Sequence, residues 1–467
     1  MPQPVRLLNT LSRRLEEFQE LEAGRVRLYT CGPTVYDFAH IGNLRTFLFE
    51  DVLRRTLTAF GYTVTQVMNL TDIDDKTIRG ANAQGVSLRE YTDRYVQAFF
   101  EDLAALGVER AEHYPRATEY VPQMIELVQR LQAKGHTYAL EGSTYFRLAT
   151  FPGYGKLSGV RLDEVKPGAR VDADEYEKED VRDFVLWKAH RPGEPFWDSP
   201  FGPGRPGWHL ECSAMAMSLL GESIDIHCGG VDNIFPHHEN EIAQSEAATG
   251  VPFARFWLHA EHLVVEGQKM AKSLGNFYTL RDLVAKGWDP QAIRYLLVSV
   301  PYRQKLNFTF EGLRGAAAAL ERIGNTVRRV AHTPVASGEG SLTLQEVEAA
   351  AVEFDAALAD DLNTARALAA LHTLLTRANQ ALDQNGIAAP VRARLEWFLD
   401  RVHRVLGVVP AVPAAPLEED VEALIAARAA ARASRDFARA DAIRNELAQR
   451  GIVLEDTPHG TVWHRRS

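Results

Sequence analysis

The chain is poor in cysteine, has no long apolar run and carries no excess of positive charge. It has 467 residues but only three cysteines, Cys31, Cys212 and Cys228. So sparse and odd a set argues against a disulfide scaffold and leaves metal binding, catalysis or core packing. No stretch approaches the roughly 20 apolar residues of a membrane helix, and the N-terminus has no apolar core of signal-peptide length. We therefore expect a cytoplasmic protein without membrane attachment.

The net charge of −10 at pH 7 argues against a surface that is basic throughout and binds nucleic acid without specificity. It leaves room for a local basic face, because contacts to phosphate depend on local charge. The hydrophobic fraction of 46% and the charged fraction of 24% are typical of globular proteins. The length predicts roughly two to four domains.

The first part of the chain alternates short apolar runs with amphipathic stretches. Residues 26–32, VRLYTCG, predict a buried strand, apolar spacing over 41–61 predicts a helix, and residues 63–69 predict a second strand. A strand–helix–strand unit indicates an α/β fold with a parallel sheet. Residues 87–107 predict a further amphipathic helix.

Residues 117–207 interrupt this pattern with β-rich runs, an acidic stretch and a segment dense in proline and glycine. The buried-strand pattern returns at residues 223–230, SIDIHCGG, and residues 235–250 predict the helix that follows. We therefore predict a Rossmann-like catalytic domain split into two halves by a connective insertion.

The remainder of the chain predicts helices over 309–332 and 344–382, then a linker, a last helix and a small hairpin turning at 458–460. We predict an α-helical bundle and a small C-terminal α/β module after the catalytic domain. The predicted boundaries are 1–116 and 208–262 for the two halves of the catalytic domain, 117–207 for the insertion, 263–308 for a lysine-motif region, 309–406 for the bundle and 407–467 for the C-terminal module.

His40 and Asn43 stand at the start of the first predicted helix, directly after the first strand. In an open α/β sheet this end of the helix faces the crevice where ligands bind, and its free N–H groups favour phosphate. Gly42 lets a ligand approach the backbone closely. On its own, the H-x-G-N pattern also fits a histidine that only caps a helix.

Two lysines in the stretch QKMAKSLGNF narrow these alternatives. Lys269 and Lys272 on their own fit solvated surface, but mobile lysines can also follow the charge of a leaving pyrophosphate. Together with His40, they resemble the HIGH and KMSKS motifs of class I aminoacyl-tRNA synthetases. Asn43 replaces the last His and Ala271 the first Ser of those motifs; an asparagine still donates to phosphate, and both lysines remain.

This resemblance implies that ATP and an amino acid form an aminoacyl-adenylate, whose acyl group then passes to the 3′ end of a tRNA. Positioning and charge stabilisation carry such a reaction. Mg²⁺ accompanies the ATP. The catalytic residues implied are His40, Asn43, Lys269 and Lys272, and these bind ATP together with Gly42 and Asp232.

The cysteines also indicate a metal site. Cys31 ends the first strand, Cys212 lies where the second half of the catalytic domain resumes, and His237 and Glu241 share a helix face because they stand four apart. Such a donor set suits Zn²⁺, although free cysteine is usually a small buried hydrophobe. Spacing alone does not choose between His237 and His238.

The motifs YTCGPTVYD, NLTDIDDK, GWHLECSAM, FPHHENEIAQ and KMAKSLGNF resemble those of cysteinyl-tRNA synthetases. In that family a zinc ion, one per chain, binds the thiolate of the substrate cysteine. The resemblance implies no separate editing domain and leaves Cys228 as a spectator. The zinc ligands implied are Cys31, Cys212, His237 and Glu241. The residues implied to line the cysteine pocket are Gly32, Thr71, Trp208 and His227.

Arginines recur at helical spacing in the last predicted helix, where a solvated face is the plain alternative. With the resemblance they imply contacts to tRNA, so the expected partners are tRNA-Cys, ATP and L-cysteine, and we expect a monomer. The alternatives are a cysteine ligase acting on an amino-sugar acceptor and a noncatalytic RNA-binding paralogue. The residues after 407 favour tRNA, and the intact motifs favour catalysis. The arginines are Arg428, Arg432, Arg435 and Arg439.

Overall fold

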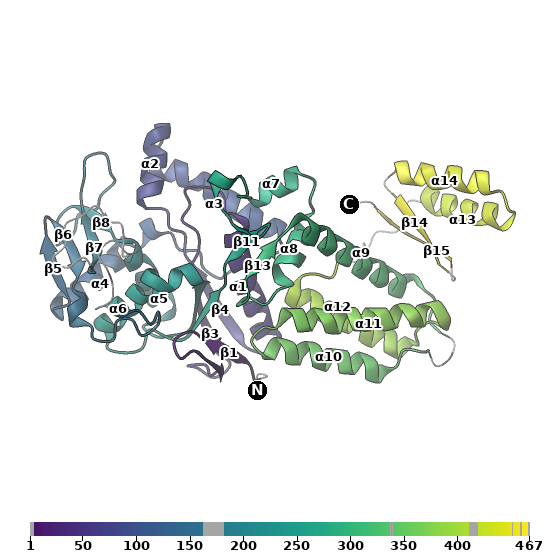
Figure 1. Cartoon of the computed structure of the whole chain (residues 1–467), viewed down its shortest axis with the longest axis horizontal. Helices are drawn as coiled ribbons and strands as arrows, with labels where there is room; N and C mark the ends of the chain where they lie inside the picture. Colours follow the sequence, from purple (N-terminus) through teal and green to yellow (C-terminus); the bar gives the residue numbers. More distant parts are fainter. Residues whose placement is uncertain are drawn as a thin grey trace. The chain divides into compact units, whose positions relative to one another are not determined.

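The computed structural model describes residues 4–161, 182–336, 338, 340–410, 419–450, 452–457 and 460–465 (Figure 1). The chain forms two compact units. The first comprises Met1–Arg314 with Ala357–Ala365, and the second comprises Gly315–Ala356 with Arg366–Ser467. The motifs predicted to carry the chemistry all fall in the first unit.

A four-stranded parallel sheet forms the centre of the first unit, with the strand order β10-β9-β3-β4. The strands are β3 Arg25–Thr30, β4 Thr63–Met68, β9 Ile224–Gly230 and β10 Ala254–Ala260. Strands from the two halves of the chain are neighbours, since β3 pairs with β9. The prediction of an α/β fold with a split parallel sheet is confirmed.

Helices cover this sheet and bury β9 along its whole length, as expected for a parallel strand with both faces covered. Tyr29 of β3 and Trp257 of β10 share one apolar core with Leu210 and Ile242 of two of these helices. The helices are α1 Ile41–Ala59, α5 Trp208–Leu220 and α6 Glu239–Thr249. The core fixes α5 and α6, which carry functional side chains, against the sheet.

Between the two halves lies an antiparallel sheet in the order β5-β6-β7-β8. It comprises β5 Thr137–Leu140, β6 Ser143–Phe146, β7 Phe184–Ala189 and β8 Gly204–Pro206, and α4 Val121–Ala133 precedes it. The other main elements of this unit are β1 Arg6–Asn9, β2 Arg14–Glu17, α2 Asp75–Gln84, α3 Leu88–Ala105, β11 Leu263–Val265, β12 Gln268–Lys269, α7 Leu280–Ala285, α8 Pro290–Val298 and β13 Leu306–Phe308.

The rest of the chain is mainly helical and ends in a two-stranded hairpin. Among the residues that the structure describes, no helix is long and apolar enough to cross a membrane. The elements are α9 Phe310–His332, α10 Leu344–Ala359, α11 Thr364–Gln384, α12 Ala389–Leu406, α13 Glu419–Ala433, α14 Phe437–Gln449, β14 Ile452–Thr457 and β15 Gly460–Arg465.

Two helical predictions differ from the structure. The stretch 344–382 is divided into α10 and α11 because Asp361 and Leu362 take the left-handed backbone conformation, with φ of 60° and 53°. The prediction of a single last helix is also wrong. The structure has two helices there, α13 and α14, and Arg435 lies between them with a φ of 61°.

This break changes the predicted tRNA-binding face. Arg428 and Arg432 belong to α13, Arg435 to the turn and Arg439 to α14, so they do not line one helix. Arg428 is buried, at 4% exposed, whereas the other three arginines are exposed. The one-face arrangement is therefore wrong, and a role in tRNA binding stays a prediction for the three exposed arginines.

Glu50 of α1 is a fully buried carboxyl group. Its side chain is 0% exposed, and neither Oε1 nor Oε2 has a hydrogen-bond partner among the residues that the structure describes. Burial raises the pKa of Glu50 well above its usual value of 4.5. The folded protein therefore keeps a proton that the unfolded chain releases, so stability falls as the pH rises above 4.5 toward the folded-state pKa.

Replacing Glu50 with glutamine is expected to stabilise the protein, and increasingly so as the pH rises. Glutamine keeps the shape but does not ionise, so its advantage grows by at most about 1.4 kcal/mol per pH unit. Urea unfolding between about pH 4 and pH 8 measures the difference. The exposed Glu126 of α4 gives the matched control Glu126→Gln, which should show no such trend. A pH-independent effect of Glu50→Gln would contradict the assignment.

Candidate active site and metal centre

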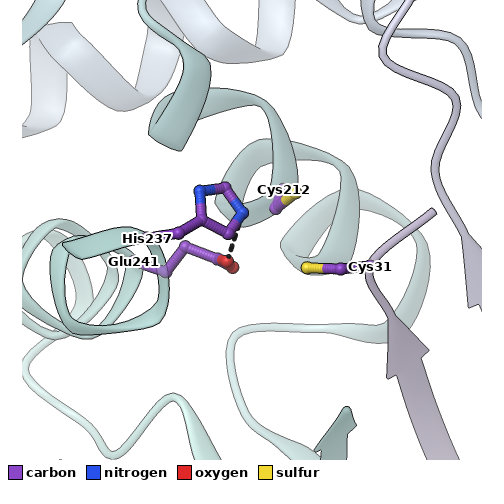
Figure 2. A group of neighbouring side chains, drawn as sticks. All are labelled: Cys31, Cys212, His237 and Glu241. Atoms are coloured by element: carbon purple, nitrogen blue, oxygen red, sulfur yellow. Dashed lines mark ion pairs between the residues drawn. The ribbon is translucent and has the colours of Figure 1, made fainter. Parts of the chain in front are cut away.

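Four side chains meet in one buried cluster beyond the carboxyl ends of β3 and β9 (Figure 2). Cys31 follows β3, Cys212 lies on α5, and His237 and Glu241 come from the start of α6 and the turn before it. One donor atom of each lies within 4.8 Å of the others. The structure thus brings together the four residues predicted as metal ligands.

The α-helix predicted over 235–250 begins later in the structure. Ile234–His238 form one π-helical turn in which Phe235 is extended, and α6 begins only at Glu239. His237 Nε2 nevertheless lies 3.0 Å from Glu241 Oε1. The spacing of four residues therefore still places both side chains on one side of the segment.

The electrostatics of the cluster favour a cation. The hydrogen bond from Cys31 lowers the pKa of Cys212 to about 6, against the effect of burial. Burial raises the pKa of Glu241, but His227 and His237 outweigh it and hold that pKa at about 2. Burial lowers the pKa of His237, but Glu241 and Cys212 outweigh it and raise that pKa to about 10. At neutral pH a thiolate and a carboxylate thus face the protonated imidazole of His237.

The donor set fits Zn²⁺, which accepts sulfur, imidazole nitrogen and carboxylate oxygen in one site. The neighbouring side chains orient two of the donors. His227 Nε2 holds Glu241 Oε2 at 3.0 Å, while Glu241 Oε1 faces His237 Nε2 at 3.0 Å. His237 Nδ1 lies 2.9 Å from His209 Nδ1, which leaves Nε2 facing the cluster. Partners of this kind fix the orientation of metal ligands.

A second donor set overlaps the first and consists of Cys31, His227, His238 and Glu241. His238 Nε2 lies 3.2 Å from Cys31 Sγ, and His238 Nδ1 lies 2.8 Å from His259 Nε2. Burial, helped by neighbouring histidines, lowers the pKa of His238 well below its usual value. Burial and His227 lower the pKa of His259 to about 3. The first set suits a dication better because it contributes both the Cys212 thiolate and the Glu241 carboxylate.

Sequence reasoning missed His209 and His259 in this cluster. His209 lies next to Trp208 in the motif GWHLECSAM, which also supplies Cys212. Its place in this motif could have indicated that it belongs to the cluster. His259 lies on β10 and reaches His238 only because β10 pairs with β9. No pattern in the sequence marks that contact.

The residues predicted to line a cysteine pocket lie against the cluster. Trp208 stacks on His237 with ring centroids 4.2 Å apart. Asn69 joins two of the others, because its Oδ1 accepts Gly32 N at 2.9 Å and its Nδ2 donates to Thr71 Oγ1 at 3.1 Å. A Cβ atom at Gly32 would lie 1.8 Å from Asn69 O, so only glycine permits this approach.

Cys228 is buried on β9 one residue after His227. Successive strand side chains point to opposite faces. Because His227 contacts Glu241, Cys228 points to the other face of the sheet. Its place agrees with the spectator role expected for it.

His40 caps α1 and keeps one ring nitrogen for a ligand. Its Nδ1 accepts the N–H groups of Gly42 and Asn43 at 3.1 and 3.2 Å. The proton of the neutral ring therefore lies on Nε2, which is a donor. Burial lowers the pKa of His40, although the carboxylate of Asp232 acts against it. Asn43 Oδ1 accepts His40 N at 3.2 Å, which leaves its Nδ2 as a second donor.

The lysine loop, residues 268–279, docks on this helix start. Ile41 N donates to Tyr278 O at 3.0 Å, and the His40 and Phe277 rings meet edge to face at 5.2 Å. Lys272 Nζ lies 2.6 Å from Asp37 Oδ2 in the loop between β3 and α1. The two motifs, about 230 residues apart, thus share one site.

Comparison with known proteins matches three family models along the chain. They are described as tRNA synthetases class I (C) catalytic domain over residues 17–318, DALR domain over 353–410 and cysteinyl-tRNA ligase anticodon binding domain over 414–463. A cysteine–tRNA ligase of Solibacter usitatus is 54% identical over 99% of this chain and 100% of its own length. One of Leptospira interrogans is 48% identical over 99% of each chain.

The chain belongs to the cysteine–tRNA ligase family. A solved methionyl-tRNA synthetase of Mycobacterium tuberculosis shares the fold, with a TM-score of 0.61 at 16% identity over 82% of this chain and 92% of its own. Membership of the cysteine–tRNA ligase family confirms the predicted family and enzyme class. The full-length match and the anticodon binding domain do not favour the amino-sugar ligase or the noncatalytic paralogue.

Proposed function

We propose that this chain activates cysteine with ATP and transfers the cysteinyl group to the 3′ end of tRNA-Cys. The observation that carries the proposal is the convergence of three segments on one edge of the sheet. The cluster of Cys31, Cys212, His237 and Glu241 lies beyond β3 and β9. The His40 cap follows β3, and the lysine loop follows β10 and contacts that cap. Ligands bind at this carboxyl edge in open α/β folds.

In the activation step, a carboxylate oxygen of cysteine attacks the α-phosphorus of ATP, and the bond from that phosphorus to the pyrophosphate oxygen breaks. His40 Nε2–H and Asn43 Nδ2–H donate to the phosphate oxygens, where negative charge develops. The side chains of Lys269 and Lys272 are exposed and accompany the pyrophosphate. Mg²⁺ enters with ATP, and Gly42 and Asp232 border the nucleotide.

Cys31, Cys212, His237 and Glu241 would hold one zinc ion. That ion would supply a Lewis acid for the thiolate of the substrate cysteine. Shape alone separates similar side chains by only about 1–3 kcal/mol. Trp208, His227, Thr71 and Gly32 border the substrate side chain. A serine hydroxyl would not bond to zinc as the cysteine thiolate does. The chain therefore needs no editing domain.

We further propose that the segment 407–467 binds the anticodon region of the tRNA and that the segment boundaries predicted from sequence delimit the functional domains. The family model matched over 414–463 supports this role. Arg432, Arg435 and Arg439 are exposed there and can reach phosphate. The chain acts as a monomer.

Amino-acid-dependent ATP–pyrophosphate exchange tests the proposal, with cysteine, serine, valine and methionine as substrates and bound zinc quantified in the same preparation. We expect exchange with cysteine alone, about one zinc per chain, and charging of tRNA-Cys. Exchange with cysteine without charging of tRNA would support an amino-sugar acceptor. Absence of exchange with any amino acid would overturn the proposal.

Replacing Asp37 with asparagine is expected to lower the KM for ATP about 2–5-fold, because the half-buried Asp37 carboxylate competes with phosphate for the exposed Lys272. Ion pairs near the surface contribute about 0.2–1 kcal/mol. The effect should vanish in a Lys272→Met background. Glu353→Gln breaks an exposed pair with Arg366 in the helical bundle and should leave KM unchanged. An equal effect of Asp37→Asn in both backgrounds would refute this pairing.

A further inference from the structure

Arg45 of α1 is a buried arginine, at 2% exposed. Two Nη1 N–H groups donate to the carbonyls of Glu261 and His262 at 2.9 and 3.1 Å. Two Nη2 N–H groups donate to the carbonyls of Pro301, at 3.3 Å, and Gln304. The fifth N–H, on Nε, has no partner among the described residues. Four carbonyls thus account for four of the five guanidinium donors.

No carboxylate lies within ion-pair distance of Arg45 in the part of the chain that the structure describes. Burial lowers the pKa of Arg45 to about 10, and the carboxylate of Glu261 acts only weakly against this. A buried charge is normally paired, because its transfer from water is costly. The positive charge of Arg45 is therefore largely uncompensated inside the protein.

Arg45 lines a cavity that α1 and α8 share with the segment Ala357–Ala365. Thr364 lines the same cavity, and its Oγ1 is buried without a partner in the described residues. The remaining walls are mainly apolar and include Phe49, Val52, Leu297, Val298 and Leu362. Two unpaired donors thus border a space whose walls offer little else that is polar.

The position of Thr364 adds to this arrangement. Thr364 is the first residue of α11, a helix of 21 residues, and helix starts favour negative charge. Asp361, the acidic residue nearest in sequence, does not line the cavity; Leu8 N and the hydroxyl of Tyr302, a wall residue, each donate to its Oδ1 at 2.8 Å. The cavity therefore carries positive potential without a carboxylate among the residues that line it.

We propose that this cavity is a binding site for a small monatomic anion of the chloride class, held by Arg45 Nε–H and the Thr364 hydroxyl. The cavity has room for about one water-sized particle, which excludes sulfate and phosphate. A water molecule would satisfy the two donors but leave the charge of Arg45 in place. An anion there joins α1, which carries His40 and Asn43 at its start, to the junction of α10 and α11.

Crystals of the full chain grown with bromide in place of chloride give the direct test. We expect an anomalous peak at the bromine edge between Arg45 Nε and Thr364 Oγ1. A water molecule in the cavity, without anomalous signal, would overturn the proposal. This readout does not depend on ligase activity, so its failure is distinguishable from failure of the proposed function.

Thermal unfolding gives a second test, in sodium chloride and in sodium gluconate of equal ionic strength. Because a ligand that binds the folded state stabilises it, we expect chloride to raise Tm saturably, by about 2–4 °C. Thr364→Val removes the hydroxyl at constant volume and should abolish the chloride-specific rise, whereas Thr364→Ser should keep it. Equal Tm values in both salts, or an unchanged rise in Thr364→Val, would refute the site.

Discussion

Replacing Cys212 with serine is expected to release the metal and to reduce cysteine-dependent pyrophosphate exchange by more than about 100-fold. Cys212 is the cluster's thiolate at neutral pH, with a pKa of about 6, and a serine hydroxyl there stays neutral. Loss of an outer partner of a metal ligand already costs about 10–100-fold. Bound zinc, measured by mass spectrometry of the purified variant, should fall from about one per chain to near zero.

Cys228→Ala is the matched control, since Cys228 is equally buried but points away from the cluster. It should keep the full zinc content and the exchange activity. The ligand assignment fails if Cys212→Ser retains zinc, or if Cys228→Ala loses it. A zinc-free variant that still prefers cysteine to serine would show that the metal does not select the substrate sulfur.

Replacing Arg294 with methionine is expected to destabilise the sheet unit by about 3–5 kcal/mol, the usual cost of breaking a buried ion pair. Arg294 of α8 and Asp51 of α1 are both fully buried, with Arg294 Nη2 lying 2.6 Å from Asp51 Oδ2. Its Nη1 also donates to the carbonyls of Leu106 and Gly107, at 2.9 and 3.1 Å. Urea unfolding followed by tryptophan fluorescence measures the loss.

Arg404→Met is the control for this prediction, because it breaks an exposed pair with Asp400 on α12. Its effect should stay within about 0.5 kcal/mol. The double variant Arg294→Met with Asp51→Leu should recover part of the loss, because it removes the unpaired carboxylate. An Arg294→Met protein as stable as the parent would show that Arg55, which also pairs with Asp51, suffices.

The sheet is predictable from the sequence because it follows short-range rules, whereas the full set of zinc ligands comes from the resemblance to cysteinyl-tRNA synthetases. Cys31 follows a six-residue strand whose last three residues are buried, and His40 caps a helix with regular apolar spacing. In a parallel sheet such strand ends meet at one edge. Spacing left His237 and His238 as alternatives, and the structure places His237 Nε2 3.0 Å from Glu241 Oε1 despite the altered turn.

Contacts that join distant segments leave no such trace. The pairing of Lys272 with Asp37 and that of His238 with His259 appear only when the strands lie side by side. Helix breaks at Asp361 and Arg435 were missed because neither is the glycine that usually marks positive φ. Asp361 takes this conformation where Tyr302 Oη and Leu8 N donate to its carboxylate, and both are far away in the sequence.

The capping of α1 by His40 has a consequence for how the enzyme responds to acidity. Two backbone N–H groups occupy Nδ1, and burial depresses the pKa of the ring, so the imidazole keeps one tautomer throughout the range above its ordinary value of 6.5. The nucleotide recognition proposed for His40 is thus insensitive to changes of pH near neutrality. In the proposed function the charge that neutralises the phosphates comes from the lysine loop, where the hydrogen bond to Asp37 raises the pKa of Lys272. The hydrogen-bond donors and the positive charge of the proposed nucleotide site thus come from two segments of the chain, which contact each other through the His40 and Phe277 rings.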